Sequence, residues 1–304
     1  MTPRATDPAS VSTTASTSTT ASGPRRRPAK RRRLLASTRV RVGLALTLFI
    51  VVLAFAGPFV APHSPSEFVG APFAGPSGAA PLGTDQLGRD VLSRVLGGGR
   101  LLVWMSLASA ALGMLLGAGA GLVAGYAGGW LDELIMRIGD VVLALPVIVF
   151  AMLFVSLLGM RLWLLVLLIG IAHAPQVARV TRGVTAEVAR REFVGSAEAL
   201  GMPRRRILLG EILPNVFTPL TVEFGLRVVW SIAAVAGLSV LGAGIRPPTA
   251  DWGLMINEGR DGMAAQPPAV IVPVLCIAIF AFGVNLVAEG MSRSVAGLDR
   301  ENGA

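Results

Sequence analysis

The stretch VGLALTLFIVVLAFAGPFV, residues 42–60, contains no charged side chain and decides the fold class. A helix needs about 20 apolar residues to cross the hydrocarbon core of a bilayer, and this stretch is long enough to do so. Five further apolar stretches of comparable length follow along the chain, at residues 101–124, 138–158, 162–178, 214–243 and 270–288. The sequence therefore predicts an all-α polytopic membrane protein with six transmembrane helices.

The composition supports this class and excludes several others. Hydrophobic residues make up 53% of the 304 residues and charged residues 15%, whereas charged residues approach about a quarter of a soluble domain. The net charge of +9 could indicate nucleic acid, but the basic residues are not interleaved with aromatics and gather near the N-terminus. The single cysteine, Cys276, lies in an apolar run and predicts a small buried hydrophobe. We therefore expect no nucleic-acid partner, no disulfide within the chain and no metal site.

The N-terminal region has a different composition from the rest of the chain. Residues 1–24 are rich in Ser, Thr, Ala and Pro without apolar spacing, and a block of Arg and Lys follows at residues 25–33. A basic block before an apolar run resembles a secretory signal peptide, but the run is too long and Pro58 and Pro62 replace a small-residue cleavage site. We predict a disordered basic cytoplasmic tail over residues 1–38 and a transmembrane domain over residues 39–304.

The distribution of Lys and Arg predicts the orientation in the membrane. Most of these residues lie in the tail and in the segment at about 179–212, between the fourth and fifth apolar stretches. The positive-inside rule therefore places both termini and this segment in the cytoplasm. Four prolines, at positions 146, 175, 219 and 273, fall within or at the ends of spans, where they free carbonyl groups and kink helices.

The segment between the fourth and fifth spans contains REFVGSAEALGMP at residues 191–203, then three arginines and EILPN. Phe193, Ala197 and Leu200 recur at i, i+4 and i+7, so a short helix here would carry one narrow apolar stripe. Gly201 followed by Pro203 predicts the end of that helix. The stripe needs a partner, and the spacing leaves both the lipid headgroup layer and another protein open.

The segment resembles the EAA loop of the binding-protein-dependent ABC importer permeases. The residues that carry the resemblance are Ala197, Ala199, Leu200 and Gly201, followed by Pro214 in Ile-Leu-Pro. In that family the loop forms a coupling helix that docks into a groove on a cytosolic ATPase, so that ATP-driven closure of the ATPases moves the transmembrane helices. The resemblance implies a type I ABC importer permease fold and a coupling role for these residues and for Phe193 of the stripe. Gly195 stands where many members have the glutamate that names the motif.

Four other stretches resemble the dipeptide and oligopeptide branch of that family, in particular its C-type subunit. They are PLGTDQLGRDVLSR at 81–94, GYAGGWLDELIMR at 125–137, the loop at 247–261 and the C-terminal end at 285–300. The resemblance covers residues from about 80 to 304 and implies a subunit of a peptide importer in a bacterial cell membrane. It also implies a second homologous permease, two cytoplasmic ATPase subunits that bind ATP and Mg, an extracytoplasmic substrate-binding protein and membrane lipid as partners. Nickel chelates and glutathione are alternative cargoes within the same branch.

Rival functions lack the residues that they need. The chain has no Gly-x4-Gly-Lys-Ser/Thr cradle for ATP phosphates, so we expect no cofactor in this chain and no enzyme activity of its own. A secondary transporter would need a coupling-ion site, normally in repeated halves, and we find no repeat. His63 and His173 are lone histidines, which predicts no catalytic residues. Asp85 and Asp90 could suggest a metal, but turn and cap roles are favoured.

Glu223 and Arg227 are the opposite charges within the fifth span. They lie four residues apart with the acid first, so they share one helix face and can pair. Isolated charges at that depth would cost roughly 3 kcal/mol each, which argues against a position facing lipid. Two interpretations remain open: a structural pair buried between helices, or a pair lining the translocation path, where a zwitterionic peptide would meet both signs. The family usually has uncharged residues here and often a glutamate at the position of Val235.

Overall fold

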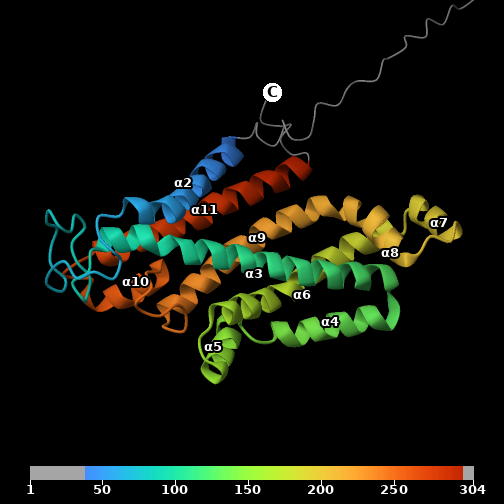
Figure 1. The fold of residues 1–304 in the computed structure, drawn as a ribbon. Coiled ribbons are helices and arrows are strands. Elements are labelled where there is room, and N and C mark those ends of the chain that lie inside the picture. The colour runs from blue at the N-terminus through green and yellow to red at the C-terminus, as the bar shows by residue number, and fades with distance from the viewer. Residues whose placement is uncertain (1–37, 297–304) are drawn as a thin grey trace, which may run out of the picture.

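The computed structural model describes residues 38–296, so the expected basic tail and the last residues of the C-terminal match lie outside the described part (Figure 1). Within it the chain is helical, apart from turns, loops and two isolated bridges. The elements are α2 Thr38–Val60, α3 Val91–Ala127, α4 Gly129–Leu143, α5 Val147–Leu158, α6 Leu162–Ala189, α7 Glu192–Ala199, α8 Arg204–Arg206, η1 Ile207–Ile212, α9 Leu213–Val240, α10 Trp252–Gly259, η2 Arg260–Gly262 and α11 Pro268–Ala296.

Five helices are long and apolar enough to cross a membrane: α2, α3, α6, the continuous run Arg204–Val240 and α11. The sixth predicted span, at 138–158, is not one straight helix, because α4 and α5 meet at an angle of 78°. The break falls just before Pro146, which lacks an N–H donor and disfavours helical backbone at the preceding residue. The prediction of six spans therefore holds if the bent pair counts as one.

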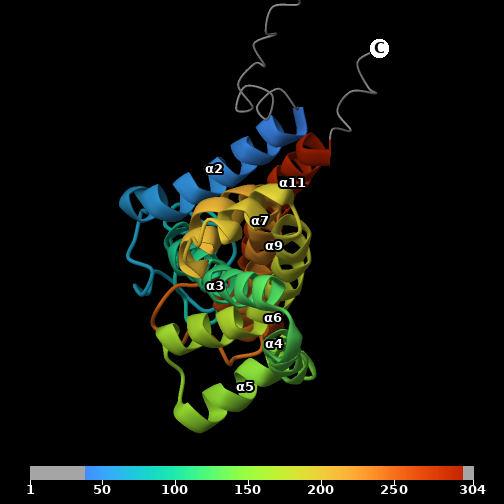
Figure 2. The same cartoon turned by 90° about the vertical axis from the view of Figure 1, so that its right-hand side faces the viewer.

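Small residues set the central packing of the bundle, where α3 lies along α6. Gly113, Gly117, Gly121 and Gly125 of α3 recur at every fourth position and face α6. A Cβ atom at any of them would come within 2.4–2.9 Å of an α6 atom. This close approach is the small-xxx-small packing of membrane helices, in which small residues let two backbones come into van der Waals contact. Such contact stabilises the helix pair in lipid, where burial of apolar surface gives little driving force. Figures 1 and 2 show α2 and α11 paired along one side of this core.

The two ends of the bundle differ (Figure 1). One end carries the loop at residues 61–90 together with α10, and the other carries α7, α8 and the ends of α3 and α6. At 1.5 Å per residue α3 is about 55 Å long and α6 about 42 Å, which exceeds the roughly 30 Å hydrocarbon core. Both helices are therefore longer than the hydrocarbon core is thick, and α7 lies at one end of them.

Four buried charged side chains join the loop before α3 to α10, and we call them the ion quartet: Asp85, Arg89, Arg94 and Glu258. Asp85 Oδ2 lies 2.7 Å from Arg89 Nε and 2.5 Å from Arg94 Nη1. Glu258 Oε2 lies 2.9 Å from Arg89 Nη2 and 2.6 Å from Arg94 Nη1. Two acids and two bases cancel, so the quartet buries charge without a net excess.

Asp85 and Asp90 also shape the local backbone. Asp90 caps α3 by accepting hydrogen bonds from the N–H groups of Leu92 and Ser93, which confirms the predicted cap. Asp85 accepts from the N–H groups of Leu87 and Arg89 in a turn. Burial alone would raise the pKa of Asp85, but the Arg89 N–H and the nearby guanidinium groups hold that pKa below its usual value. No group of three potential metal ligands occurs within residues 38–296.

Candidate coupling loop and intramembrane ion pair

The helix α7 presents a different apolar face from the one that its sequence predicted. Ala197 is buried, together with Val194, in a cluster that includes Ile207 and Ile212. Phe193 is 37% exposed and Leu200 is 82% exposed. The predicted stripe of Phe193, Ala197 and Leu200 is therefore split, because Ala197 packs against the loop's own interior. Only the two larger side chains remain available to a partner.

Gly201 ends α7 in the way that the sequence predicted. Its backbone has φ +72°, in the left-handed region, where a side chain would cost roughly 1 kcal/mol. The N–H of Gly201 donates to the Glu198 carbonyl at 2.9 Å and the N–H of Met202 donates to the Ala197 carbonyl at 3.1 Å. These two bonds form a Schellman motif. Ala199, in the last turn, is exposed.

Gly195, where many family members have glutamate, faces open space. No heavy atom lies within 4 Å of a Cβ atom built at this position or at Gly201. A side chain at Gly195 would therefore meet no steric obstacle within the described chain, and its backbone φ is ordinary. The departure from the family pattern thus leaves the shape of α7 unchanged.

A hydrogen bond from Tyr126, the only tyrosine of the chain, ties α7 to the end of α3. The Tyr126 hydroxyl lies 2.7 Å from Glu198 Oε1 and donates to it. Since α7 also follows α6 directly, it is attached to two long helices at once. Sequence reasoning missed this contact, although a lone tyrosine at the end of a span is a possible signal for it.

Pro214 lies just after a π-helical segment. In η1, Ile207–Ile212, the backbone shifts to wider turns, and the N–H of Leu213 donates to the Leu208 carbonyl five residues earlier. Pro214 has no N–H, and in an α-helix its ring would crowd the carbonyl four residues earlier, at Gly210. The wider register accommodates the proline where the loop enters α9. Such segments occur frequently at functional sites.

The outer surface of this loop combines apolar and basic side chains. Leu209 is 52% exposed beside the exposed arginines of α8, Arg204–Arg206. A surface hollow of about 520 Å³ is lined by Pro203, Arg205, Arg206, Leu209 and Gly210. A partner that fits this surface needs an apolar ridge flanked by acidic groups.

Glu223 and Arg227 pair as their spacing predicts. Arg227 Nε lies 3.0 Å from Glu223 Oε1, and the residues are 8% and 7% exposed, respectively. Arg227 Nη1 also donates to Gln176 Oε1 of α6, so the pair joins α9 to α6. Val235, where the family often has glutamate, is buried among apolar side chains.

These features define a class: a multi-pass helical membrane protein with a short helix tethered at one end of its long helices, as a transport permease needs. Comparison with known proteins gives the family. The family model described as binding-protein-dependent transport system inner membrane component matches residues 117–297, which include α7, Pro214 and the ion pair. The chain belongs to this family of bacterial inner-membrane permeases. A second model, the N-terminal TM domain of oligopeptide transport permease C, matches residues 30–76 and places the chain in the peptide-type branch.

Individual relatives agree with this assignment. The chain is 37% identical over 199 residues to the glutathione transport system permease protein GsiD of Pectobacterium atrosepticum, and 36% identical to GsiD of Escherichia coli O6:K15:H31. The match covers 66% of this chain and 66% of each relative. Among solved structures, the MetNI methionine ABC transporter in inward-facing conformations matches with a TM-score of 0.51 at 16% identity. That match covers 66% of this chain and 96% of the other, and it shows the ABC importer permease fold.

Proposed function

We propose that this chain is the membrane-spanning subunit of an ATP-driven importer that moves short peptides across the bacterial membrane. The observation that carries the proposal is α7, which lies at one end of the long helices and buries Val194 and Ala197, while Phe193 and the Leu200 that follows the helix are exposed. Exposed apolar side chains on a short, fixed helix indicate a protein partner. That partner would be one of two cytoplasmic ATPase subunits. These subunits would bind ATP and Mg, because this chain has no Gly-x4-Gly-Lys-Ser/Thr motif to hold the phosphates.

The coupling would pass through three attachments of α7. The chain itself joins α7 to α6, the Tyr126 hydrogen bond joins it to α3, and η1 with Pro214 joins it to α9. A push on Phe193 and Leu200 would therefore reach three long helices, while Ala197, Ala199 and Gly201 would keep the shape of α7. A second homologous permease would complete the path, and an extracytoplasmic binding protein would deliver the cargo.

We infer that the cargo is a short peptide. The peptide-type family match and the glutathione permeases among the relatives support this, because glutathione is itself a short peptide. The test is ATP hydrolysis by the reconstituted complex with binding protein loaded with a dipeptide, a longer peptide, glutathione or a nickel chelate. We expect stimulation by at least one peptide. Stimulation by the chelate alone would reject a peptide cargo, and no stimulation by any cargo would reject the importer.

We also infer that both termini and the segment at about 179–212 lie in the cytoplasm. The excess of Lys and Arg on that side supports this orientation, with the basic block at residues 25–33 next to the first span. Removing residues 1–24 should leave uptake nearly intact, whereas removing the block as well should reduce correct insertion. Loss of transport on the first truncation, in protein that reaches the membrane, would give the tail a function of its own.

A further inference from the structure

Three polar side chains of α6 form contacts with neighbouring helices along one line, and we call this line the polar seam. Arg182 Nε lies 2.5 Å from Asp132 Oδ1 of α4, Arg179 pairs with Asp140 of α4, and Gln176 accepts from Arg227 of α9. Positions 176, 179 and 182 are neighbours on the helix surface, because residues three apart lie one above the other. The line winds around α6 from the α4 side to the α9 side.

The seam is exposed on a helix that is otherwise well packed. Gln176, Arg179 and Arg182 are exposed, whereas the neighbouring Val177 and Thr181 face α3 and are fully buried. The side chains of Arg179 and Asp140 are 51% and 55% exposed. Charged side chains with this exposure are costly against lipid, so they face water or protein.

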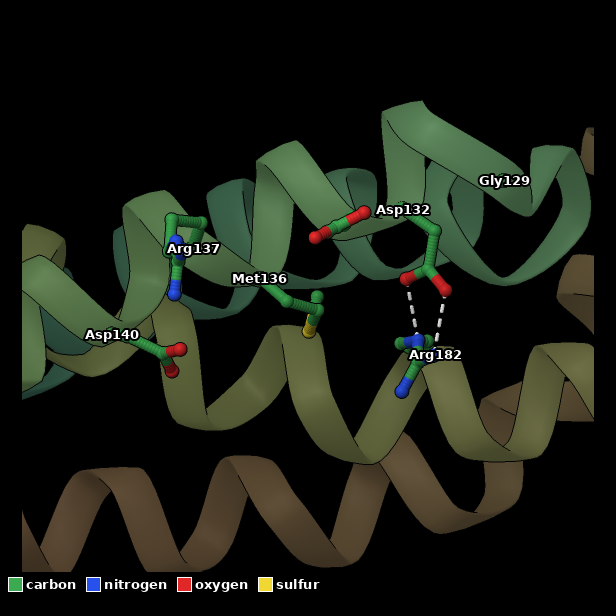
Figure 3. A pocket seen from close by; sticks show the side chains of 7 residues that line it. Gly129, Asp132, Met136, Arg137, Asp140 and Arg182 are labelled. Atoms are coloured by element: carbon green, nitrogen blue, oxygen red, sulfur yellow. Dashed lines mark hydrogen bonds and ion pairs between the residues drawn. The ribbon is translucent and has the colours of Figure 1, made fainter.

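The helix α4 has two faces of opposite character. On one face, Trp130, Leu134, Ile138 and Val141 follow helical spacing and are between 45% and 74% exposed. These apolar side chains suit lipid, with Trp130 at the end of the helix, where aromatic side chains favour the membrane interface, and the exposed Arg137 lies at the edge of this face. Figure 3 shows Asp132, Met136 and Asp140 on the other face, directed towards α6. Asp132 is the most covered of the charged side chains of α4, at 16% exposed, whereas Asp140 remains 55% exposed beside the cavity.

A cavity of about 300 Å³ lies between the polar side of α4 and α6 (Figure 3). It is lined by Gly129, Asp132, Glu133, Met136, Arg137, Asp140 and Arg182. Among the described residues, Glu133 and Arg137 form no ion pair, so one acidic and one basic group remain available there. The cavity begins near Gly129 at the α7 end of the bundle, and the seam continues from it to the Glu223–Arg227 pair.

We propose that the polar seam lines the cytoplasmic exit of the translocation path and contacts a peptide that carries both an ammonium and a carboxylate group. This rests on the function proposed above. The acids and bases along the seam come in neighbouring pairs, so each end of such a peptide meets an opposite charge at every step. The acids and bases balance, with three ion pairs and the unpaired Glu133 and Arg137, so the seam carries no net charge that would retain the peptide, and passage requires sites that release as readily as they bind.

The test uses cysteine probes on the two faces of α4, in a Cys276→Ala parent assembled with its partner subunits in inside-out vesicles. Met136→Cys places a thiol in the cavity and Ile138→Cys places one on the apolar face, so the two variants are matched on one helix. A charged, membrane-impermeant thiosulfonate should label position 136 at least tenfold faster than position 138. Labelling at 136, but not at 138, should also reduce peptide uptake at least tenfold.

Two results would overturn the proposal. Equal labelling at both positions would mean that α4 has no water-facing side, and slow labelling at both would mean that another subunit covers the cavity. ATP hydrolysis stimulated by the loaded binding protein separates these failures from a failure of the proposed function. If stimulation is normal while labelling fails, only the seam is rejected; if the parent shows no stimulation, the importer and the seam are both rejected.

Discussion

Leu200→Asp should separate assembly of the membrane domain from its coupling to ATP hydrolysis. Leu200 is 82% exposed and follows α7 just before the Gly201 cap, so the substitution leaves the buried cluster of the loop intact. If Leu200 is buried in the ATPase groove, its removal forfeits roughly 2 kcal/mol of docking free energy. That loss weakens docking by about thirtyfold, and a desolvated carboxylate weakens it further.

The assay measures ATP hydrolysis by the reconstituted complex with and without loaded binding protein. We expect Leu200→Asp to reach the membrane at normal levels and to lose nearly all stimulation. Gly195→Asp is the matched control, because it adds the same carboxylate to α7 at a position with open space and removes no apolar side chain. Normal stimulation in Leu200→Asp, or an equal loss in Gly195→Asp, would refute the docking role of Leu200.

Three further outcomes are expected. Reporter fusions at Ser196 should report the cytoplasm and fusions at Gly78 the outside, and opposite signals at either position would break the predicted orientation. The double swap Glu223→Arg with Arg227→Glu should restore expression but leave uptake impaired or altered in cargo preference if the pair lines the path, whereas full uptake of the original cargo would identify a purely structural pair. Glu258→Gln leaves two buried guanidinium groups with one acid of the quartet, so the melting temperature of the purified complex should fall by roughly 10 °C. An unchanged melting temperature would show that the ion quartet contributes little to thermal stability.

The features that were predictable from sequence depend on residues close together in the chain. The Glu223–Arg227 contact follows from a spacing of four within one helix, and the end of α7 follows from one glycine in the left-handed region. The apolar spans were identifiable by length because the bilayer imposes that length. The exception is the span at 138–158, where Pro146 breaks the helix rather than only kinking it.

The features that were missed depend on contacts between distant segments. Spacing within α7 could not show that Val194 and Ala197 would pack against η1, because that choice depends on where Ile207 and Ile212 lie. The polar seam joins α4, α6 and α9, and no spacing within a single helix indicates it. The glycines of α3 do carry a visible four-residue repeat, which could have predicted its close approach to another helix.

The ion quartet makes the loop before α3, the first turn of α3 and the helix α10 a single unit for exchange between proteins. A chimera that keeps α10 but takes residues 61–94 from a protein without these arginines would break contacts between Arg89, Arg94 and Glu258 that span more than 160 positions of sequence. One unmatched buried charge would cost several kcal/mol, so a graft that carries only one loop is expected to fold poorly. Exposed residues on the same loop, such as Phe68 and Leu87, lie outside this constraint. Engineering of this end of the bundle can therefore vary these exposed side chains, provided that the buried charges are transferred together.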